Sequence, residues 1–374
     1  MEQTLFPEEI EFGDKADDEE VPSPEIPKEV RKLRTQAYDK SVSDIIRSIR
    51  DGDLMLDPDY QRNYVWDNKK ASLLVESILL NVPIPVIYVS EDEESKWSVV
   101  DGLQRLYSLY RFFSNEFRLI GLEVLTELKG LTYLKLNPKA SRILNNGILR
   151  IIVILQESHP EIKYDIFQRL NQSPIKLTEQ ELRNCVYRGS FINMLKDLRS
   201  NKKFLKCVGF KGPQKRFLDA ELILRYFALA DSFNSETGEV TGYLSKMKTF
   251  LNSYIEKHKL ATPKEITQFE KRFEDTIDKV HFVFGKQAFR RVVDTAGNKD
   301  ALLNRALMDV IMVSFERYCL DDIKRKKDDI VKLYASLPFE DTKFADSISY
   351  RTSDNKELEY RLCTWLREIN NLMS

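Results

Sequence analysis

The chain of 374 residues lacks the sequence features of disulfide-rich, fibrous and membrane-spanning proteins. Its 4 cysteines, at positions 185, 207, 319 and 363, form no Cys-x-x-Cys pair, which argues against a disulfide framework or a zinc site. Glycine and proline, 13 of each, are too scarce for a fibrous or low-complexity protein. No apolar run reaches the roughly 20 residues of a membrane span, and the N-terminus is acidic where a signal peptide would be basic. We therefore expect a soluble cytoplasmic protein with reduced thiols and no membrane partner.

Charge is balanced over the whole chain but not along it. Residues 1–29 hold eleven carboxylates and two lysines, a net charge of −9, whereas the whole chain carries −1, so residues 30–374 carry +8. Closely spaced Pro22, Pro24 and Pro27 prevent a helix or strand there. We predict that residues 1–35 form an acidic disordered tail, either a solubilising one or one that occupies the basic body until a nucleic acid displaces it.

The remaining chain divides into two regions of different periodicity. Ser41 is a candidate N-cap for a helix that ends at Gly52. Strands are expected at 86–89, 97–100 and 148–155. Beyond residue 160 helical periodicity dominates. The prediction is an α+β protein, with a small α+β domain at 36–158 followed by a larger all-helical domain at 159–374.

The most informative stretch is 98–106, SVVDGLQRL, in which a strand turns at Gly102 directly into a helix. Such a junction presents unpaired backbone N–H groups and the positive end of the helix dipole, a site for anions such as phosphate. Arg105 is positioned to contact phosphate oxygens, Asp101 to bind magnesium and Gln104 to orient a water molecule. The same pattern is common in α/β folds without a phosphate ligand.

A second cluster, residues 58–66 with the sequence PDYQRNYVW, precedes the next predicted helix. Its tyrosines and Arg62 could stack on a base or contact a phosphate. For Trp66, packing in the small domain's core is the better interpretation.

Together these motifs resemble a known family. YQR at 60–62 with Trp66, then ESIL at 76–79, PIP at 83–85 and DGLQR at 101–105 follow the order of the N-terminal domain of the GmrS type, also called domain of unknown function 262. Its hallmark is Asp-Gly-Gln-Gln-Arg. The resemblance continues through IFQRLN at 166–171 and LTEQELRN at 177–184.

The resemblance implies a ParB/sulfiredoxin-like fold that binds, and often hydrolyses, a nucleoside triphosphate (GTP, CTP or ATP) with Mg²⁺. By matching position, it makes Asp101 and Gln104 the candidate catalytic residues, with Asp101 as metal ligand. Gln61, Arg62, Gly102 and Arg105 are the candidate nucleotide-binding residues. Members act in prokaryotic anti-phage systems that recognise modified DNA, and ParB-like domains often pair, so a homodimer is a further expectation.

One position departs from the family. Leu103 stands where the family usually has its first glutamine, and a leucine side chain cannot coordinate a metal or orient water. The departure bears on hydrolysis more than on binding. It also separates the chain from sulfiredoxins, which need a cysteine in this loop.

DNA is the second expected partner. A basic stretch interleaved with Phe204 and Phe210 has the composition of a phosphate-binding loop. Its candidate nucleic-acid contacts are Lys202, Lys203, Lys206, Lys211, Lys215 and Arg216. A shorter basic run, KRKK at 324–327, is flanked by aspartates. We interpret it as a solvated helix face whose positive charges are neutralised by those aspartates.

A nuclease centre is not apparent. The 3 histidines, His159, His258 and His281, stand alone, whereas a His-Asn-His nuclease needs a histidine base near metal ligands. We therefore expect no nuclease activity of its own and a separate nuclease or effector as partner. The leading hypothesis is a nucleotide-binding regulatory protein, possessing weak NTPase activity at most, in an anti-phage or modified-DNA restriction system. The alternative is a DNA-binding or protein-binding scaffold whose nucleotide pocket is inactive.

Overall fold

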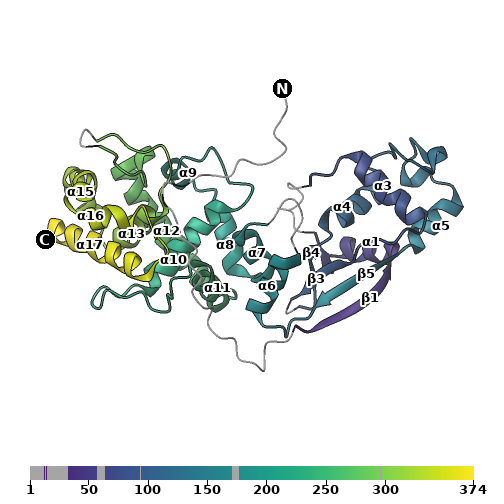
Figure 1. Ribbon diagram of the computed structural model, residues 1–374, viewed down its shortest axis with the longest axis horizontal. Helices are drawn as coiled ribbons and strands as arrows, with labels where there is room; N and C mark the ends of the chain where they lie inside the picture. The colour runs from purple at the N-terminus through teal and green to yellow at the C-terminus, as the bar shows by residue number, and fades with distance from the viewer. Residues whose placement is uncertain are drawn as a thin grey trace. The chain divides into compact units, whose positions relative to one another are not determined.

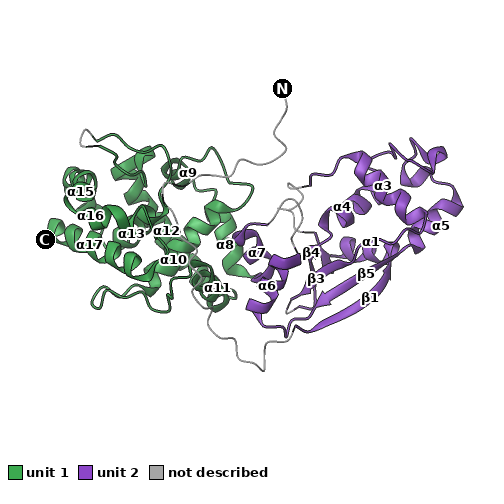
Figure 2. Cartoon of the chain, viewed as in Figure 1, with its two compact units in different colours: residues 1–25, 189–374 green, residues 26–188 purple. Residues whose placement is uncertain are grey.

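The computed structural model describes residues 12, 14, 33–56, 64–92, 94–170, 177–294 and 297–374. The chain divides into two compact units (Figure 2). Residues 26–188, purple there, are called the first unit below because they come first among the helices and strands, and residues 1–25 with 189–374, green there, are called the second or helical unit. The sequence places the boundary at residue 158, whereas the first unit extends thirty residues further, to Arg188. Each unit is described by itself below.

The first unit is built on a mixed sheet of five strands in its described part, in the order β1-β5-β3-β4-β2 (Figure 1). β1 pairs antiparallel with β5, β3 pairs parallel with β5 and antiparallel with β4, and β2 pairs parallel with β4. The strands are β1 (Thr35–Ser41), β2 (Leu54–Met55), β3 (Ile87–Glu91), β4 (Trp97–Asp101) and β5 (Ile148–Ile154). In β5, Leu149, Ile151 and Val153 are buried, which reflects the period of two of a strand. The three predicted strands are confirmed within a residue or two.

Helices pack around this sheet and close one hydrophobic core. They are α1 (Val42–Asp51), α3 (Asn68–Leu79), α4 (Leu103–Phe113), α5 (Pro138–Asn146), α6 (Pro160–Leu170) and α7 (Glu179–Val186). Ser41 caps α1 by accepting a hydrogen bond from Asp44 N, and Gly52 ends it at φ 82°, as predicted. The core includes Ile45 and Ile46 of α1 and Leu106 and Leu109 of α4.

The regular elements of the second unit, in its described part, are helices. Its helices are α8 (Ser190–Leu198), α9 (Lys202–Val208), α10 (Leu218–Ser232), α11 (Met247–His258), α12 (Pro263–Phe284), α13 (Arg305–Phe315), α14 (Leu320–Arg325), α15 (Lys327–Glu340), α16 (Thr342–Ser347) and α17 (Asn355–Met373). α13 lies at the centre, contacting α10, α12 and α17. In α17 the buried Trp365 donates a hydrogen bond to Ser314 Oγ at 2.8 Å. The α+β class with a mixed domain before a helical one is confirmed.

No helix in the described ranges combines the length and the apolar character that a bilayer crossing requires.

Candidate functional site

Gly102 forms the junction between β4 and α4. Its φ of 99° lies in the left-handed region, and an added Cβ would lie 2.9 Å from Ile87 Cγ1. Only glycine therefore fits without strain. As the N-cap residue it provides no side-chain cap for the first turn of α4. A helix start without a side-chain cap is the kind of position that suits an anion, and the anion site itself stays a prediction.

Arg105 lies within reach of this junction but is engaged by the protein. Its guanidinium donates to Asp101 Oδ2 at 2.9 Å and to the carbonyl oxygens of Pro85 and Val86, the latter at 3.3 Å. The side chain is only 12% exposed. Burial lowers the pKa of Arg105, and the Asp101 carboxylate opposes that shift. Arg105 thus joins the start of α4 to the segment that enters β3.

Asp101 is more accessible than its partner, with 38% of its side chain exposed. In the described part of the chain no group of three or more His, Cys, Asp or Glu side chains is arranged to hold a metal ion. Mg²⁺ is commonly held by one or two carboxylates together with substrate phosphates and water. Asp101 fits that mode, but not an all-protein metal cage.

Gln104 contacts the backbone of the upstream segment. Its Oε1 accepts hydrogen bonds from Val65 N at 3.1 Å and Trp66 N at 3.3 Å. The amide therefore anchors this segment to α4, a contact that sequence reasoning did not predict. Gln61 and Arg62, the other predicted nucleotide-binding residues, lie outside the described residues.

Aromatic side chains extend from this segment along α4. Tyr64 shares a 2.8 Å hydrogen bond with Ser108, and its ring meets Tyr107 edge to face at 5.0 Å. The guanidinium carbon of Arg111 lies 5.0 Å from the Tyr64 ring centroid. Trp66 packs against the core, as expected for it. Tyr64, Tyr107 and Arg111 thus form one aromatic and cationic cluster along α4.

Leu103, the residue that departs from the family hallmark, packs against the hydrophobic core. Its side chain is thereby directed toward apolar neighbours. The leucine contributes burial at a position where the family usually has a polar glutamine.

Glu76 opens the second motif, and its role here is structural. The buried carboxylate accepts hydrogen bonds from the backbone N–H groups of Glu123, Val124 and Leu125, the shortest at 2.8 Å. Burial raises the pKa of Glu76, but these three donors outweigh it, so that the net shift is downward. The motif residue therefore fixes a loop instead of facing a ligand.

A buried polar row on α7 was not among the predicted site residues. Gln180, Glu181, Arg183 and Asn184 are all buried, and α7 contacts β4, as α6 does. Thr178 and Glu181 form a capping box that fixes where α7 begins. The residues were present in the quoted motif at 177–184, but their burial could not be predicted from their polar character.

Two polar atoms in this region are unsatisfied. Ser98 Oγ of β4 and Asn184 Nδ2 of α7 are buried and have no hydrogen-bond partner within the described residues. Buried polar groups are normally bonded, so each such atom points to a water molecule or a ligand group.

The predicted nucleic-acid residues belong to the helical unit. Lys202, Lys203 and Lys206 are exposed on α9, so that the first half of the predicted loop is a helix, capped by Asn201. Lys211 and Lys215 are exposed in the following turn, and Arg216 is half-buried. The turn is fixed by Asp219, whose carboxylate accepts from Gln214 N at 2.6 Å. The role of these side chains in binding nucleic acid stays a prediction.

The histidines of the helical unit do not form a catalytic centre in the described part. His258 lies among aromatic rings, with its centroid 4.6 Å from Tyr254 and 5.4 Å from Phe269. Burial lowers the pKa of both His258 and His281.

The first unit is thus an α+β domain in which Gly102 joins a strand directly to a helix. Residues 42–188 match the family described as GmrSD restriction endonuclease, N-terminal domain, which confirms the resemblance for this part of the chain. The match implies a restriction-system context. Comparisons with curated proteins and with solved structures gave no match.

Proposed function

We propose that the first unit binds the phosphates of a nucleoside triphosphate at the start of α4. In this proposal the chain is the nucleotide-responsive regulator of an anti-phage system that restricts modified DNA, acting with a separate nuclease. The observation that carries the proposal is the uncapped N-terminus of α4 at Gly102, within a domain that matches a restriction family.

Each residue then has a distinct part in binding. Gly102 adopts the left-handed conformation that turns β4 into α4, and an added Cβ there would lie 2.9 Å from Ile87 Cγ1; the turn presents the start of α4 to the phosphate. Arg105 exchanges a carbonyl oxygen of Pro85 or Val86 for a phosphate oxygen, while keeping its link to Asp101. Mg²⁺, when bound with the nucleotide, supplies charge neutralisation, and Asp101 is the residue that would hold it. Gln61 and Arg62 complete the proposed contacts.

Hydrolysis is the weaker part of the family's chemistry in this chain. Leu103 packs in the core, and Gln104 Oε1 already accepts two backbone N–H groups. A water molecule would have to compete with those bonds for the Gln104 oxygen. We therefore propose a binding switch in which Asp101 and Gln104 give slow turnover at most.

Binding of labelled GTP, CTP and ATP with Mg²⁺ tests the proposal, with phosphate release followed in the same samples. Arg105→Ala should weaken affinity by about tenfold or more, because a charge-assisted hydrogen bond contributes about 1.5 to 3 kcal/mol. Arg150→Ala is the matched control, since Arg150 contacts only the exposed Asp39 among the described residues, at 2.8 Å. Equal affinity of a folded Arg105→Ala variant and wild type would refute the site.

A DNA-binding scaffold with an inactive nucleotide pocket is the second candidate. It is favoured by the engagement of both Arg105 and Gln104 with protein groups and by the exposed lysines of α9 and the turn after it. It predicts salt-dependent DNA binding that no nucleotide changes. Lys211→Ala with Lys215→Ala should then reduce the salt slope by about one for each lost phosphate contact. Lys324→Ala with Arg325→Ala is the control, because both side chains pair with aspartates one turn away.

A further inference from the structure

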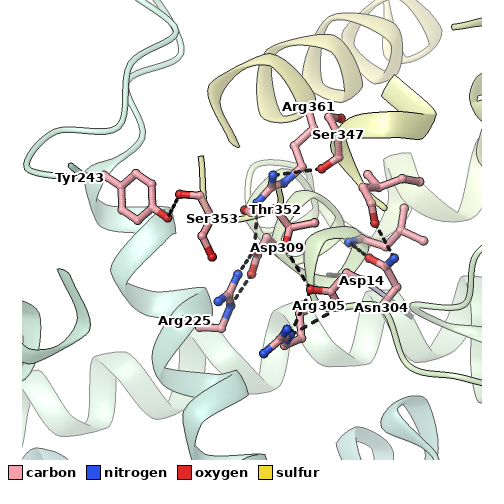
Figure 3. Close-up of polar contacts among 12 residues, drawn as sticks. Asp14, Arg225, Tyr243, Asn304, Arg305, Asp309, Ser347, Thr352, Ser353 and Arg361 are labelled. Atoms are coloured by element: carbon pink, nitrogen blue, oxygen red, sulfur yellow. Dashed lines mark hydrogen bonds and ion pairs between the residues drawn. The ribbon is translucent and has the colours of Figure 1, made fainter. Parts of the chain in front are cut away.

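Two residues of the acidic N-terminal stretch, Phe12 and Asp14, contact helices and loops of the helical unit, and Figure 3 shows the contacts of Asp14. Phe12 and Asp14 are described there, and Asp14 is buried, with only 1% of its side chain exposed. A stretch whose composition predicts disorder therefore contains a pair of residues with defined tertiary contacts.

Asp14 is bound at the start of α13. Its Oδ1 accepts a hydrogen bond from Arg305 N at 2.9 Å, and its Oδ2 lies 3.1 Å from Arg305 Nε. Thr352 Oγ1 donates to the same Oδ2 at 3.2 Å. Asn304, the N-cap, bonds a different amide, Leu307 N. The carboxylate is therefore held by a helix N–H, a guanidinium and a hydroxyl, a complete set for one carboxylate.

Phe12 provides a second anchor two residues earlier. Its backbone forms a parallel β-bridge with Leu303. The guanidinium carbon of Arg305 lies 4.2 Å from the Phe12 ring centroid, a cation–π distance. One arginine thus contacts the aromatic ring and the carboxylate of the same short segment.

Two buried arginines near Asp14, Arg225 and Arg361, share a single carboxylate, that of Asp309. Arg225 donates to Asp309 at 3.2 and 2.6 Å, and Arg361 Nη2 lies 3.6 Å from the same carboxylate. Both arginines are buried, so that with Arg305 three guanidinium groups share Asp309 and Asp14. Burial lowers the pKa of Arg361, while Asp309 and Asp14 oppose this shift. A vacated Asp14 position would leave buried positive charge in excess, which is costly.

We propose that the helical unit carries a binding site for acidic peptides with an aromatic side chain two residues before a carboxylate, and that Phe12 and Asp14 occupy it in cis. The ligand class is a Phe-x-Asp segment, recognised by Arg305, Thr352 and the backbone at Leu303. Because a tethered segment has a high effective concentration, a partner protein with the same pair must bind more tightly to displace it. This inference does not depend on the nucleotide site.

A labelled peptide of residues 8–18 tests the site on the full-length chain. The variant Phe12→Ala with Asp14→Ala vacates the site in cis and should bind the peptide, whereas wild type and the control Asp18→Ala keep their own segment and should bind it about tenfold less tightly or worse. The same peptide carrying Asp14→Ala should lose about tenfold in affinity for the vacated chain, as expected for a charge-assisted contact. Equal binding of both peptides, or no binding to the vacated chain, would overturn the proposal.

Hydrogen exchange gives a second readout that requires no added peptide. In the full chain the Arg305 amide should exchange faster in Asp14→Ala than in wild type, because its acceptor is removed, and Asp18→Ala should leave it unchanged. Unchanged exchange in Asp14→Ala would contradict the contact. A wild-type dimer that Asp14→Ala dissociates would overturn occupation in cis, because the segment would then come from a second copy.

Discussion

The two units each place an arginine and an aspartate at the start of a helix, but they obtain the aspartate differently. At α4 the partner of Arg105 is Asp101, four residues away, and the helix start itself carries no side-chain cap. At α13 the partner of Arg305 is Asp14, which comes from nearly three hundred residues away and fills the helix start. In our proposal the helix start at Arg105 is left for an anion, whereas the chain's own Asp14 carboxylate occupies the helix start at Arg305.

The difference separates what local sequence can encode from what only tertiary structure provides. A spacing of four residues on a helix can be recognised directly, and the strand-glycine-helix pattern around it predicts the anion site. The Asp14 contact has no such local pattern. It depends on Arg225, Asp309 and Arg361, which come from separate helices. Their two positive charges and one negative charge favour a further carboxylate nearby.

The largest expected effect is at the buried centre of the second arrangement. Asp309→Asn should destabilise the protein by about 3 to 5 kcal/mol, because it leaves Arg225 and Arg361 buried without their carboxylate. Urea unfolding followed by circular dichroism measures the change. A loss below about 1 kcal/mol would mean that Asp14 alone balances both arginines, and that the two carboxylates are interchangeable.

Gly102→Ala should have the next largest effect, and it tests the open site directly. The left-handed φ costs about 1 to 3 kcal/mol for a residue with a Cβ, and the contact with Ile87 adds to it. Gly52→Ala is the matched control, because Gly52 has φ 82° but an added Cβ would meet nothing within 4 Å. Nucleotide affinity should fall in Gly102→Ala and persist in Gly52→Ala. Equal stability loss and unchanged affinity in both would show that the junction is only a turn.

A smaller effect is expected from His258 of the helical unit, whose contribution to stability depends on pH. Burial lowers the pKa of His258 in the helical unit, so the unfolded chain takes up a proton more readily than the folded one. Its contribution to stability is therefore present above about pH 6.5, the ordinary value for histidine, and is lost as pH falls through that value toward the lowered pKa. His258→Phe, which suits the aromatic surroundings, should reduce the acid-dependent loss in a urea midpoint series from pH 7.5 to 5.5. An unchanged slope would assign the loss to other groups.

The fold was largely predictable because its signals are local. Ser41 and Gly52 bound α1 as their cap preferences require, and the contiguous β-branched residues Ile151 to Ile154 predict β5. β1 was not predicted, since its polar residues at the sheet edge lack an apolar alternation. α9 was read as a loop from its lysines, although Phe204 and Cys207 bury one face of it.

The candidate site was predictable only in part. The types of residue at 101–105 indicate an anion site, and Gly102 has the predicted conformation. That Gln104 bonds Val65 and Trp66, and that Leu103 turns into the core, depends on which neighbours the fold brings together. The same reason hides the Asp14 contact, whose surrounding composition predicts no structure at all.

The smallest effect is expected where an ion pair lies in water. Arg150 and Asp39 form two 2.8 Å hydrogen bonds between β5 and β1, and both side chains are at least half exposed. The Arg150 guanidinium lowers the pKa of Asp39, but solvent screens such pairs and side-chain entropy offsets them. Asp39→Asn should therefore leave the urea midpoint indistinguishable from wild type at 0.15 M salt, in contrast to Asp309→Asn. If Asp39→Asn and Asp309→Asn lowered the urea midpoint equally, the geometry of an arginine-aspartate pair and not its burial would set its contribution to stability. Burial would then not explain why Asp14 is held at the start of α13.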